Sequence, residues 1–357
     1  MSLRDRHAAS FDRRLVGRAA FCILDELLQV LIEPIDLLDE PVEHLSIRAL
    51  SHVRRRFVHL AHFGTRADAT KCSVPRAGED DADGLYRIVT SSLEPMEGRN
   101  QGSDVRVSID DGIAYVSLDR PERRNALSHS VLVQLTELFD ALGQSDDVRL
   151  VVLEATGSAF SAGHDIAEMV GHDEDWYRDL FTTCTMLMNL LRQLARPVIA
   201  KVDGVATAAG CQLVAGCDLA VASDRSTFAT PGVRIGLFCS TPLVPVARAI
   251  GPKRALEMLL TGEPIDAVTA LSWGLVNRVV PADQLDAAID ELARQIMRYS
   301  PQVIELGKLA FYEQLALSER GAYEVMTEVM TANALMPDAQ EGMSAFLEKR
   351  AAVWNEA

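Results

Sequence analysis

From residue 105 onward, short apolar segments of strand length alternate with longer segments whose apolar residues recur at helical spacing. Residues 105–109 and 113–118 alternate with a period of two on either side of Asp110, Asp111 and Gly112, which predicts a β-hairpin. Beyond Pro242 the pattern is helical, apart from residues 275–280. Strands that alternate with helices predict an α/β core, followed here by a helical C-terminal region. The predicted strands after the hairpin are residues 150–155, 198–202 and 219–222, and the predicted helices are residues 130–142, 176–194 and 208–215.

Residues 1–100 differ in composition from the rest of the chain and predict no ladder of strands. Arginine is frequent in residues 1–20, and an acidic stretch at residues 79–81 precedes Met96. Three interpretations stay open for this part: a poorly ordered extension, an upstream segment ahead of a start at Met96, and a targeting peptide. We therefore expect three parts, at residues 1–100, 101–280 and 281–357.

The charge balance excludes some classes of partner. The formal net charge is −16 at pH 7, and an acidic surface repels the phosphates of nucleic acids and anionic membranes. The apolar run at residues 21–32 is too short to span a bilayer and contains Asp25 and Glu26. The six cysteines form no C-x-x-C pair, which is typical of reduced thiols. We expect a cytoplasmic protein, or a mitochondrial one if the arginine-rich start is a transit peptide.

Two glycine-containing loops are the candidate site. Residues 159–166 and 203–212 each follow a predicted strand and are made largely of small side chains. Small side chains let a ligand approach the backbone, and free N–H groups at the start of a helix favour negative charge. Two such loops that face each other form an oxyanion hole, with two backbone donors aimed at one carbonyl oxygen. Each loop taken alone is better explained as a tight packing turn.

Several ordered stretches between residues 105 and 354 resemble the crotonase (enoyl-CoA hydratase/isomerase) superfamily. The resemblance implies an α/β fold in which ββα units wind into a spiral. It also implies C-terminal helices that build homotrimers and often hexamers. The matching stretches include Leu118-Asp-Arg-Pro-Glu-Arg-Arg-Asn-Ala-Leu, Ala159-Phe-Ser-Ala-Gly-His-Asp-Ile, Arg196-Pro-Val-Ile-Ala-Lys-Val-Asp-Gly, Cys217-Asp-Leu-Ala-Val-Ala and Glu341-Gly-Met-Ser-Ala-Phe-Leu-Glu-Lys-Arg.

The resemblance also implies roles for individual residues. The backbone N–H groups of His164 and Ala209 are expected to hold the thioester oxygen of an acyl-CoA, and Gln212 to meet the substrate. No metal or redox cofactor is implied, because CoA enters as part of the substrate. The other expected substrate- and CoA-binding residues are Arg123, Arg124, Ala126, Leu127, Ala162, Gly163, Asp165, Ile166, Gly232, Phe346 and Lys349.

The sequence departs from the family where the acid/base pair of a hydratase is expected. Hydration of a 2,3-double bond needs groups that take a proton from water and deliver one to carbon, and two glutamates do this in the hydratases. The matching positions here are Gln212 and Gly232, which cannot transfer a proton near neutral pH. Ordinary hydratase activity is therefore not expected. Glu168 and residues 173–175 are conceivable substitutes, although each is more typical of a solvated surface.

Three interpretations of the function stay open. The first is an enzyme of fatty-acyl-CoA metabolism that uses the oxyanion hole for isomerisation, decarboxylation or thioester cleavage. The second is a non-catalytic protein that binds acyl-CoA, which the residue types of Gln212 and Gly232 favour. The third is a protein whose C-terminal helices serve mainly for assembly and whose pocket no longer binds a CoA ester. The sequence does not specify the acyl chain.

Overall fold

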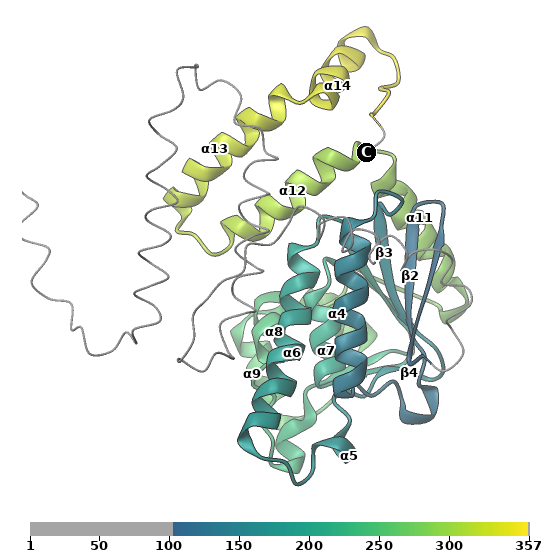
Figure 1. Ribbon diagram of the computed structural model, residues 1–357, viewed down its shortest axis with the longest axis vertical. Helices are drawn as coiled ribbons and strands as arrows, with labels where there is room; N and C mark the ends of the chain where they lie inside the picture. The colour runs from purple at the N-terminus through teal and green to yellow at the C-terminus, as the bar shows by residue number, and fades with distance from the viewer. Residues whose placement is uncertain (1–102, 356–357) are drawn as a thin grey trace, which may run out of the picture. The chain divides into compact units, whose positions relative to one another are not determined.

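The computed structural model describes residues 103–355, which form two β-sheets with helices packed against them (Figure 1). The first sheet has six strands in the order β1-β2-β3-β5-β7-β10, and the second has four in the order β4-β6-β8-β9. The predicted segment at residues 1–100 and its alternative start at Met96 lie outside the described residues. The strands are β1 Val105–Asp110, β2 Ile113–Leu118, β3 Leu150–Ala155, β4 Ala159–Ser161, β5 Val198–Val202, β6 Val205–Thr207, β7 Leu219–Ser223, β8 Thr227–Ala229, β9 Ile265–Asp266 and β10 Arg278–Val280.

Helices follow the strand pairs and then fill the C-terminal part of the chain. Short 3-10 helices occur at Pro121–Arg123 (η4), Pro231–Ile235 (η5) and Ala282–Gln284 (η6). No helix among residues 103–355 is both long and apolar enough to cross a membrane. The α-helices are α4 His129–Gln144, α5 Ile166–Met169, α6 Glu174–Gln193, α7 Ala209–Gly216, α8 Leu243–Ile250, α9 Pro252–Thr261, α10 Ala267–Trp273, α11 Leu285–Met297, α12 Pro301–Gln314, α13 Glu319–Leu335 and α14 Pro337–Glu348.

The predicted hairpin is confirmed, with a tight turn at its tip. Strands β1 and β2 are antiparallel, and Asp110 pairs with Ile113. The two turn residues, Asp111 and Gly112, have φ values of 46° and 77°, which a two-residue turn with the twist of the strands requires. The remaining neighbours in the six-stranded sheet are parallel, an arrangement that needs crossover connections, which the helices supply here.

The repeating unit is two strands followed by a helix. Within each later repeat, the first strand joins the six-stranded sheet and the second joins the four-stranded sheet. The sequence predicts the first strands well, but it gives no separate strand for β4, β6 and β8. Each of these has three residues, too few for an alternating pattern to show. The expected α/β spiral of ββα units with a helical C-terminal region is confirmed.

Apolar side chains cover both faces of the six-stranded sheet. On one face, Phe139 from α4 and Leu187 from α6 are buried in the main core. On the other face, Ile289 from α11 packs with Val152 and Ile199 in a smaller buried cluster. A central strand buried on both faces reads as a continuous apolar run, which explains why residues 150–153 are recognisable without any alternation.

A buried ion pair holds α12 to this core. Lys308 Nζ lies 2.7 Å from Asp218 Oδ2 and donates to the carbonyl oxygens of Leu191 and Arg196 at 2.9 and 2.8 Å. The Tyr312 hydroxyl donates to Asp218 Oδ1 at 2.8 Å, and the Val198 N–H donates to Oδ2 at 2.6 Å. Burial lowers the pKa of Lys308 and raises that of Asp218. The extensive hydrogen bonding stabilises two charges that would otherwise be costly to bury.

Replacement of Tyr312 by phenylalanine is expected to lower the free energy of unfolding by about 2 kcal/mol, because it removes a hydrogen bond to a buried carboxylate. Urea denaturation of both proteins measures this difference. Tyr299→Phe is a matched control, since that hydroxyl receives its hydrogen bond from the exposed Arg298. Equal losses in the two variants would contradict the role of Asp218.

Candidate active site

A cavity of about 170 Å³ lies where the loop before α5 meets the start of α7 and the segment after η5. Its walls are mostly apolar, as in most sites for small molecules. Of the predicted residues, Ala162, His164, Ile166, Ala209 and Gly232 line it. The full lining consists of Ala162, His164, Ile166, Met169, Phe181, Ala208, Ala209, Gly232, Ile235, Leu237, Phe238, Cys239, Ser240, Thr241 and Pro242.

Two backbone amides at this cavity have no hydrogen-bond acceptor. Within residues 103–355, neither the His164 N–H nor the Ala209 N–H donates a hydrogen bond, although both residues line the cavity. The Leu127 N–H donates to the Gly163 carbonyl and the Leu127 carbonyl accepts from the Asp165 N–H, so the His164 N–H between them stays free. Ala209 is fully buried, and a buried N–H without a partner is rare in a folded protein. Two free amides at one cavity are the kind of donors that the sequence-based expectation of an oxyanion hole requires.

The backbone before Ala209 is strained in a way that frees its amide. Ala208 has φ 51° and ψ −118°, a conformation that a residue with a Cβ rarely adopts. Such a conformation costs about 1–3 kcal/mol and persists only where the surrounding structure imposes it. Here the Ala208 N–H donates to Ala229 in β8, which fixes the turn immediately before α7 begins.

Glycine is required where the two loops touch. Gly163 has φ +88°, and a Cβ at this position would lie 2.8 Å from the Ala208 Cβ and 3.1 Å from the Ala209 nitrogen. A Cβ at Gly210 would lie 2.4 Å from the Ser161 carbonyl oxygen. Any larger residue at either position must therefore push the loops apart. The glycines set the separation of the two free amides.

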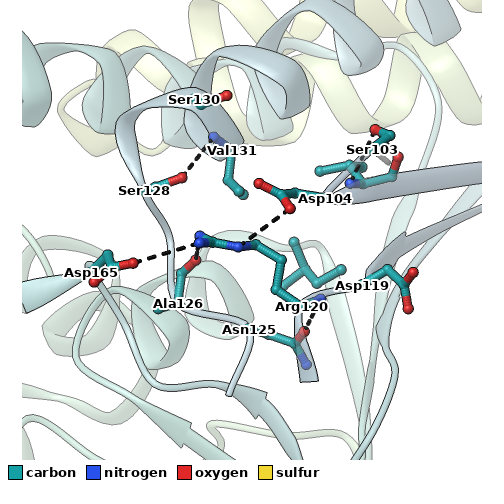
Figure 2. Close-up of polar contacts among 12 residues, drawn as sticks. Ser103, Asp104, Asp119, Arg120, Asn125, Ala126, Ser128, Ser130, Val131 and Asp165 are labelled. Carbon is teal, nitrogen blue, oxygen red and sulfur yellow. Dashed lines mark hydrogen bonds and ion pairs between the residues drawn. The ribbon is translucent and has the colours of Figure 1, made fainter. Parts of the chain in front are cut away.

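Arg120 holds the first loop in place (Figure 2). Its guanidinium lies 3.4 Å from Asp104 and 3.7 Å from Asp165, and it donates to the Ala126 carbonyl at 3.1 Å. Asp165 in turn accepts from the Ala167 N–H and caps α5. The structure thus gives Asp165 a positioning role next to His164. The sequence did not single out Arg120, whose side chain is only 16% exposed.

Asn125 is a second residue that the sequence did not single out. Its amide donates to the carbonyls of Thr156 and Ala159 at 2.8 and 2.7 Å and accepts from the Arg120 N–H. Its backbone is left-handed, with φ 52°. A buried asparagine that satisfies three backbone groups shapes the loop. Asparagine after an arginine pair could have signalled this turn, because asparagine tolerates a left-handed backbone.

The two predicted CoA-binding segments lie side by side. The Ala162 N–H donates to the Arg124 carbonyl at 3.0 Å, and the Leu127 N–H donates to the Gly163 carbonyl at 2.8 Å. Ala126 and Leu127 are buried. Arg123 and Arg124 are exposed, and neither forms an ion pair with a described residue. Both guanidinium groups are therefore available to bind an anion.

Gln212 and Gly232 occupy different surroundings. Gln212 is 2% exposed and lines a separate cavity of about 100 Å³ with Asn189 and Arg192; its Oε1 is 4.0 Å from the Cys184 Sγ. Gly232 lines the main cavity, but a Cβ there would lie 2.0 Å from the Leu237 carbonyl oxygen. The segment after η5 therefore fills the space that a side chain at residue 232 would need.

The carboxylates considered as substitutes do not line the main cavity. Glu168 accepts from the His129 N–H at 3.0 Å, at the first residue of α4. Asp173 caps α6, and Glu174 pairs with Arg178. Each of these carboxylates already has a structural partner.

Phe346 and Lys349 do not line this cavity within one chain. Figure 1 shows α14, which carries Phe346, at the far end of the fold from α5. Phe346 is 82% exposed, and Lys349 ends the helix with a left-handed backbone.

Comparison with known proteins identifies the family of this chain. The sequence pattern described as enoyl-CoA hydratase/isomerase matches residues 108–357. The chain belongs to the enoyl-CoA hydratase/isomerase family. Human enoyl-CoA hydratase domain-containing protein 3, mitochondrial, is 48% identical over 248 residues, which cover 69% of this chain and 81% of that protein. The 2,3-dehydroadipyl-CoA hydratase of Escherichia coli is 32% identical, with 70% and 97% covered.

Solved structures of the same enoyl-CoA hydratase/isomerase family confirm the fold. An enoyl-CoA hydratase of Mycobacterium smegmatis superposes with a TM-score of 0.70 at 44% identity, over 71% of this chain and 99% of that one. Human enoyl-CoA hydratase domain-containing protein 3 superposes with a TM-score of 0.69 at 45% identity, over 71% and 100%. The sequence around Gln212, Gly232 and residues 237–242 resembles that protein, and this prediction is confirmed.

Proposed function

We propose that the protein binds an acyl-CoA thioester and holds its carbonyl oxygen between the N–H groups of His164 and Ala209. The observation that supports this most directly is the pair of unpartnered amides at one apolar cavity. Both donors are preorganised, so an enolate-like charge on the oxygen is stabilised without any reorganisation of the backbone. The exposed Arg123 and Arg124 would hold the phosphates of the CoA.

A comparison of two ligands tests whether the His164 and Ala209 amides bind the carbonyl oxygen. Butyryl-CoA has the carbonyl oxygen, and S-butyl-CoA is the same molecule without it. We expect butyryl-CoA to bind about 10- to 100-fold more tightly in calorimetry, since two hydrogen bonds contribute about 1 kcal/mol each. Equal affinities would contradict the oxyanion hole. Absence of binding by either ligand would contradict an acyl-CoA site altogether.

The reaction is proposed to differ from ordinary hydration. Neither Gln212 nor Gly232 can transfer a proton, and the nearby Glu168 is occupied at the start of α4. Wild-type protein is therefore expected to leave crotonyl-CoA unchanged, followed as the absorbance of the conjugated thioester. Brisk loss of that absorbance would contradict the proposal. The alternative function is a protein that binds acyl-CoA without converting it, which the same two residues favour.

Assembly into a homotrimer or hexamer is part of the proposal. Helix α13 buries none of its residues within the described chain, and Tyr323, Met330 and Leu335 are 69–76% exposed. A run of exposed apolar side chains on paired helices is typical of a subunit interface. Light scattering measures the mass of the species in solution.

A mitochondrial location is also proposed in place of the cytoplasmic prediction. The relatives that are 44–48% identical carry mitochondrial names, and residues 1–20 are rich in arginine. Import of a fusion between residues 1–100 and a fluorescent protein tests it. A diffuse cytoplasmic signal would contradict it.

A further inference from the structure

Only two titratable side chains line the main cavity, within the part of the chain that the structure describes. These are the imidazole of His164 and the thiol of Cys239. Burial raises the pKa of Cys239, so its thiol stays protonated and is a poor base near neutral pH. Proton transfer inside the cavity therefore falls to His164.

The ring of His164 is buried, and its hydrogen-bonding neighbour among the described residues is the Leu127 backbone. Nδ1 and Nε2 are both shielded from solvent, so at least one of the two nitrogens has no partner among the described residues. The ring packs edge-on against Phe181, with the ring centres 5.6 Å apart. A buried donor or acceptor that is left unsatisfied costs about 1–3 kcal/mol. Such a cost is typical of functional groups that find their partner only when a ligand is bound.

The His164 ring can turn by 180° within the space that it already occupies. The two orientations of an imidazole that differ by 180° occupy nearly the same volume, and they exchange Nε2 with Cε1 and Nδ1 with Cδ2. His164 lines the cavity in its present orientation, so a flipped ring needs no new space. Since the same residue also supplies an oxyanion amide, a bound thioester would place its reacting carbons within one side-chain length of the ring.

We infer that the imidazole of His164 is the single proton carrier of this site, and that it takes a proton from C2 of the bound acyl-CoA thioester. This inference rests on the proposed acyl-CoA site and deepens it. One proton carrier suits a 1,3-proton shift better than hydration. Hydration needs one group for the water and a second for the carbon, whereas a shift uses the same proton twice.

The step balances without any co-reactant. A ring nitrogen takes the C2 proton of a 3-enoyl-CoA, and the electron pair of that C–H bond forms a dienolate whose oxygen is held by the His164 and Ala209 amides. The imidazolium then returns the proton to C4. The C3–C4 π electrons form the new C4–H bond, C2 and C3 become doubly bonded, and the carbonyl is restored as 2-enoyl-CoA.

The surroundings keep the ring neutral and available as a base. Burial lowers the pKa of His164, and the Leu127 backbone and the Glu168 carboxylate raise it by less. On the same loop, Asp165 is directed at Arg120, and the facing helix α6 contributes the uncharged Phe181. Proton abstraction should therefore hold steady from pH 8 to below the ordinary histidine value of about 6.5, and fall only at lower pH.

The test follows exchange of the C2 protons of butyryl-CoA in D₂O by proton NMR. Wild type is expected to exchange them, and His164→Gln to exchange them about 100-fold more slowly or worse, since a general base contributes at least that factor. His164→Gln keeps the backbone N–H, so its affinity for butyryl-CoA should stay within a few fold of wild type. His172→Gln is the matched control, because His172 is exposed and stacks on Trp176. Isomerisation of 3-hexenoyl-CoA should follow the same order.

The outcomes separate this inference from the proposed function. Wild type that binds butyryl-CoA without exchanging its C2 protons would overturn the role of the ring and leave the binding site standing. Equally fast exchange by His164→Gln would do the same. An acid limb at or above pH 6.5 would show that another group carries the proton. Absence of butyryl-CoA binding would overturn the proposed function and this inference together.

Discussion

Gly232→Glu is expected to destabilise the fold by about 5 kcal/mol and to leave crotonyl-CoA unhydrated, although it restores the residue type of a hydratase at this position. The Cβ alone would lie 2.0 Å from the Leu237 carbonyl oxygen and 2.8 Å from the Cys239 Sγ. A carboxylate at this buried position would also have no cationic partner among the residues that line the cavity. Thermal and urea denaturation measure the stability, and the absorbance of crotonyl-CoA measures hydration.

Two smaller substitutions separate the causes. Gly232→Ala adds only the Cβ, and we expect it to cost about 3 kcal/mol through crowding alone. Gly307→Ala is the control, because nothing lies within 4 Å of its Cβ and alanine favours a helix by about 0.5–1 kcal/mol. A Gly232→Ala protein as stable as wild type would mean that the segment after η5 yields easily. A hydratase could then be rebuilt by changing Gln212 and Gly232 together.

Gly163→Ala is expected to weaken binding of butyryl-CoA by about 10-fold, because it disturbs the two amides that together contribute about 2 kcal/mol to binding of the carbonyl oxygen. The new Cβ would meet the Ala208 Cβ at 2.8 Å and the Thr207 carbonyl at 2.9 Å. The loop before α5 must then move away from α7, which widens the gap between the His164 and Ala209 amides. Calorimetry with butyryl-CoA and S-butyl-CoA measures the effect, and only the carbonyl ligand should lose affinity.

Gly171→Ala is the matched control for this substitution. Its φ of +86° is nearly that of Gly163, so both variants should lose about 1–2 kcal/mol of stability to the left-handed backbone. Nothing lies within 4 Å of the Gly171 Cβ, so the affinity for butyryl-CoA should not change. Equal affinities in the two variants would show that the spacing of the two loops does not determine the affinity for butyryl-CoA.

The sequence predicts the strands and helices that show an apolar run or a helical spacing within their own residues. Strands β3 and β5 are predicted to the residue, because they are apolar runs buried between two layers. Helices α4, α6 and α7 differ from their predictions by only one or two residues at each end. The three-residue strands of the second sheet are held by pairing between successive repeats, as in Val205 with Thr227. Such pairing leaves no local signal.

The sequence predicts the parts of the site that the backbone forms. It does not predict the parts that depend on contacts between distant side chains. Glycine and alanine in the two loops point to close backbone approach, which the structure shows at Gly163 and Ala208. Arg120 and Asn125 read as ordinary turn residues, because their partners lie up to 45 residues away. The surroundings of Gly232 also depend on a contact with Leu237 that spacing alone does not reveal.

His164 contributes to the cavity through two chemically separate parts, an amide and a ring. Every residue except proline supplies the amide, so ligand capture at this position is indifferent to mutation. The ring is specific to histidine, so reactivity can change while capture is preserved. Substitutions at position 164 can therefore change the chemistry of the side chain while they keep the backbone donor.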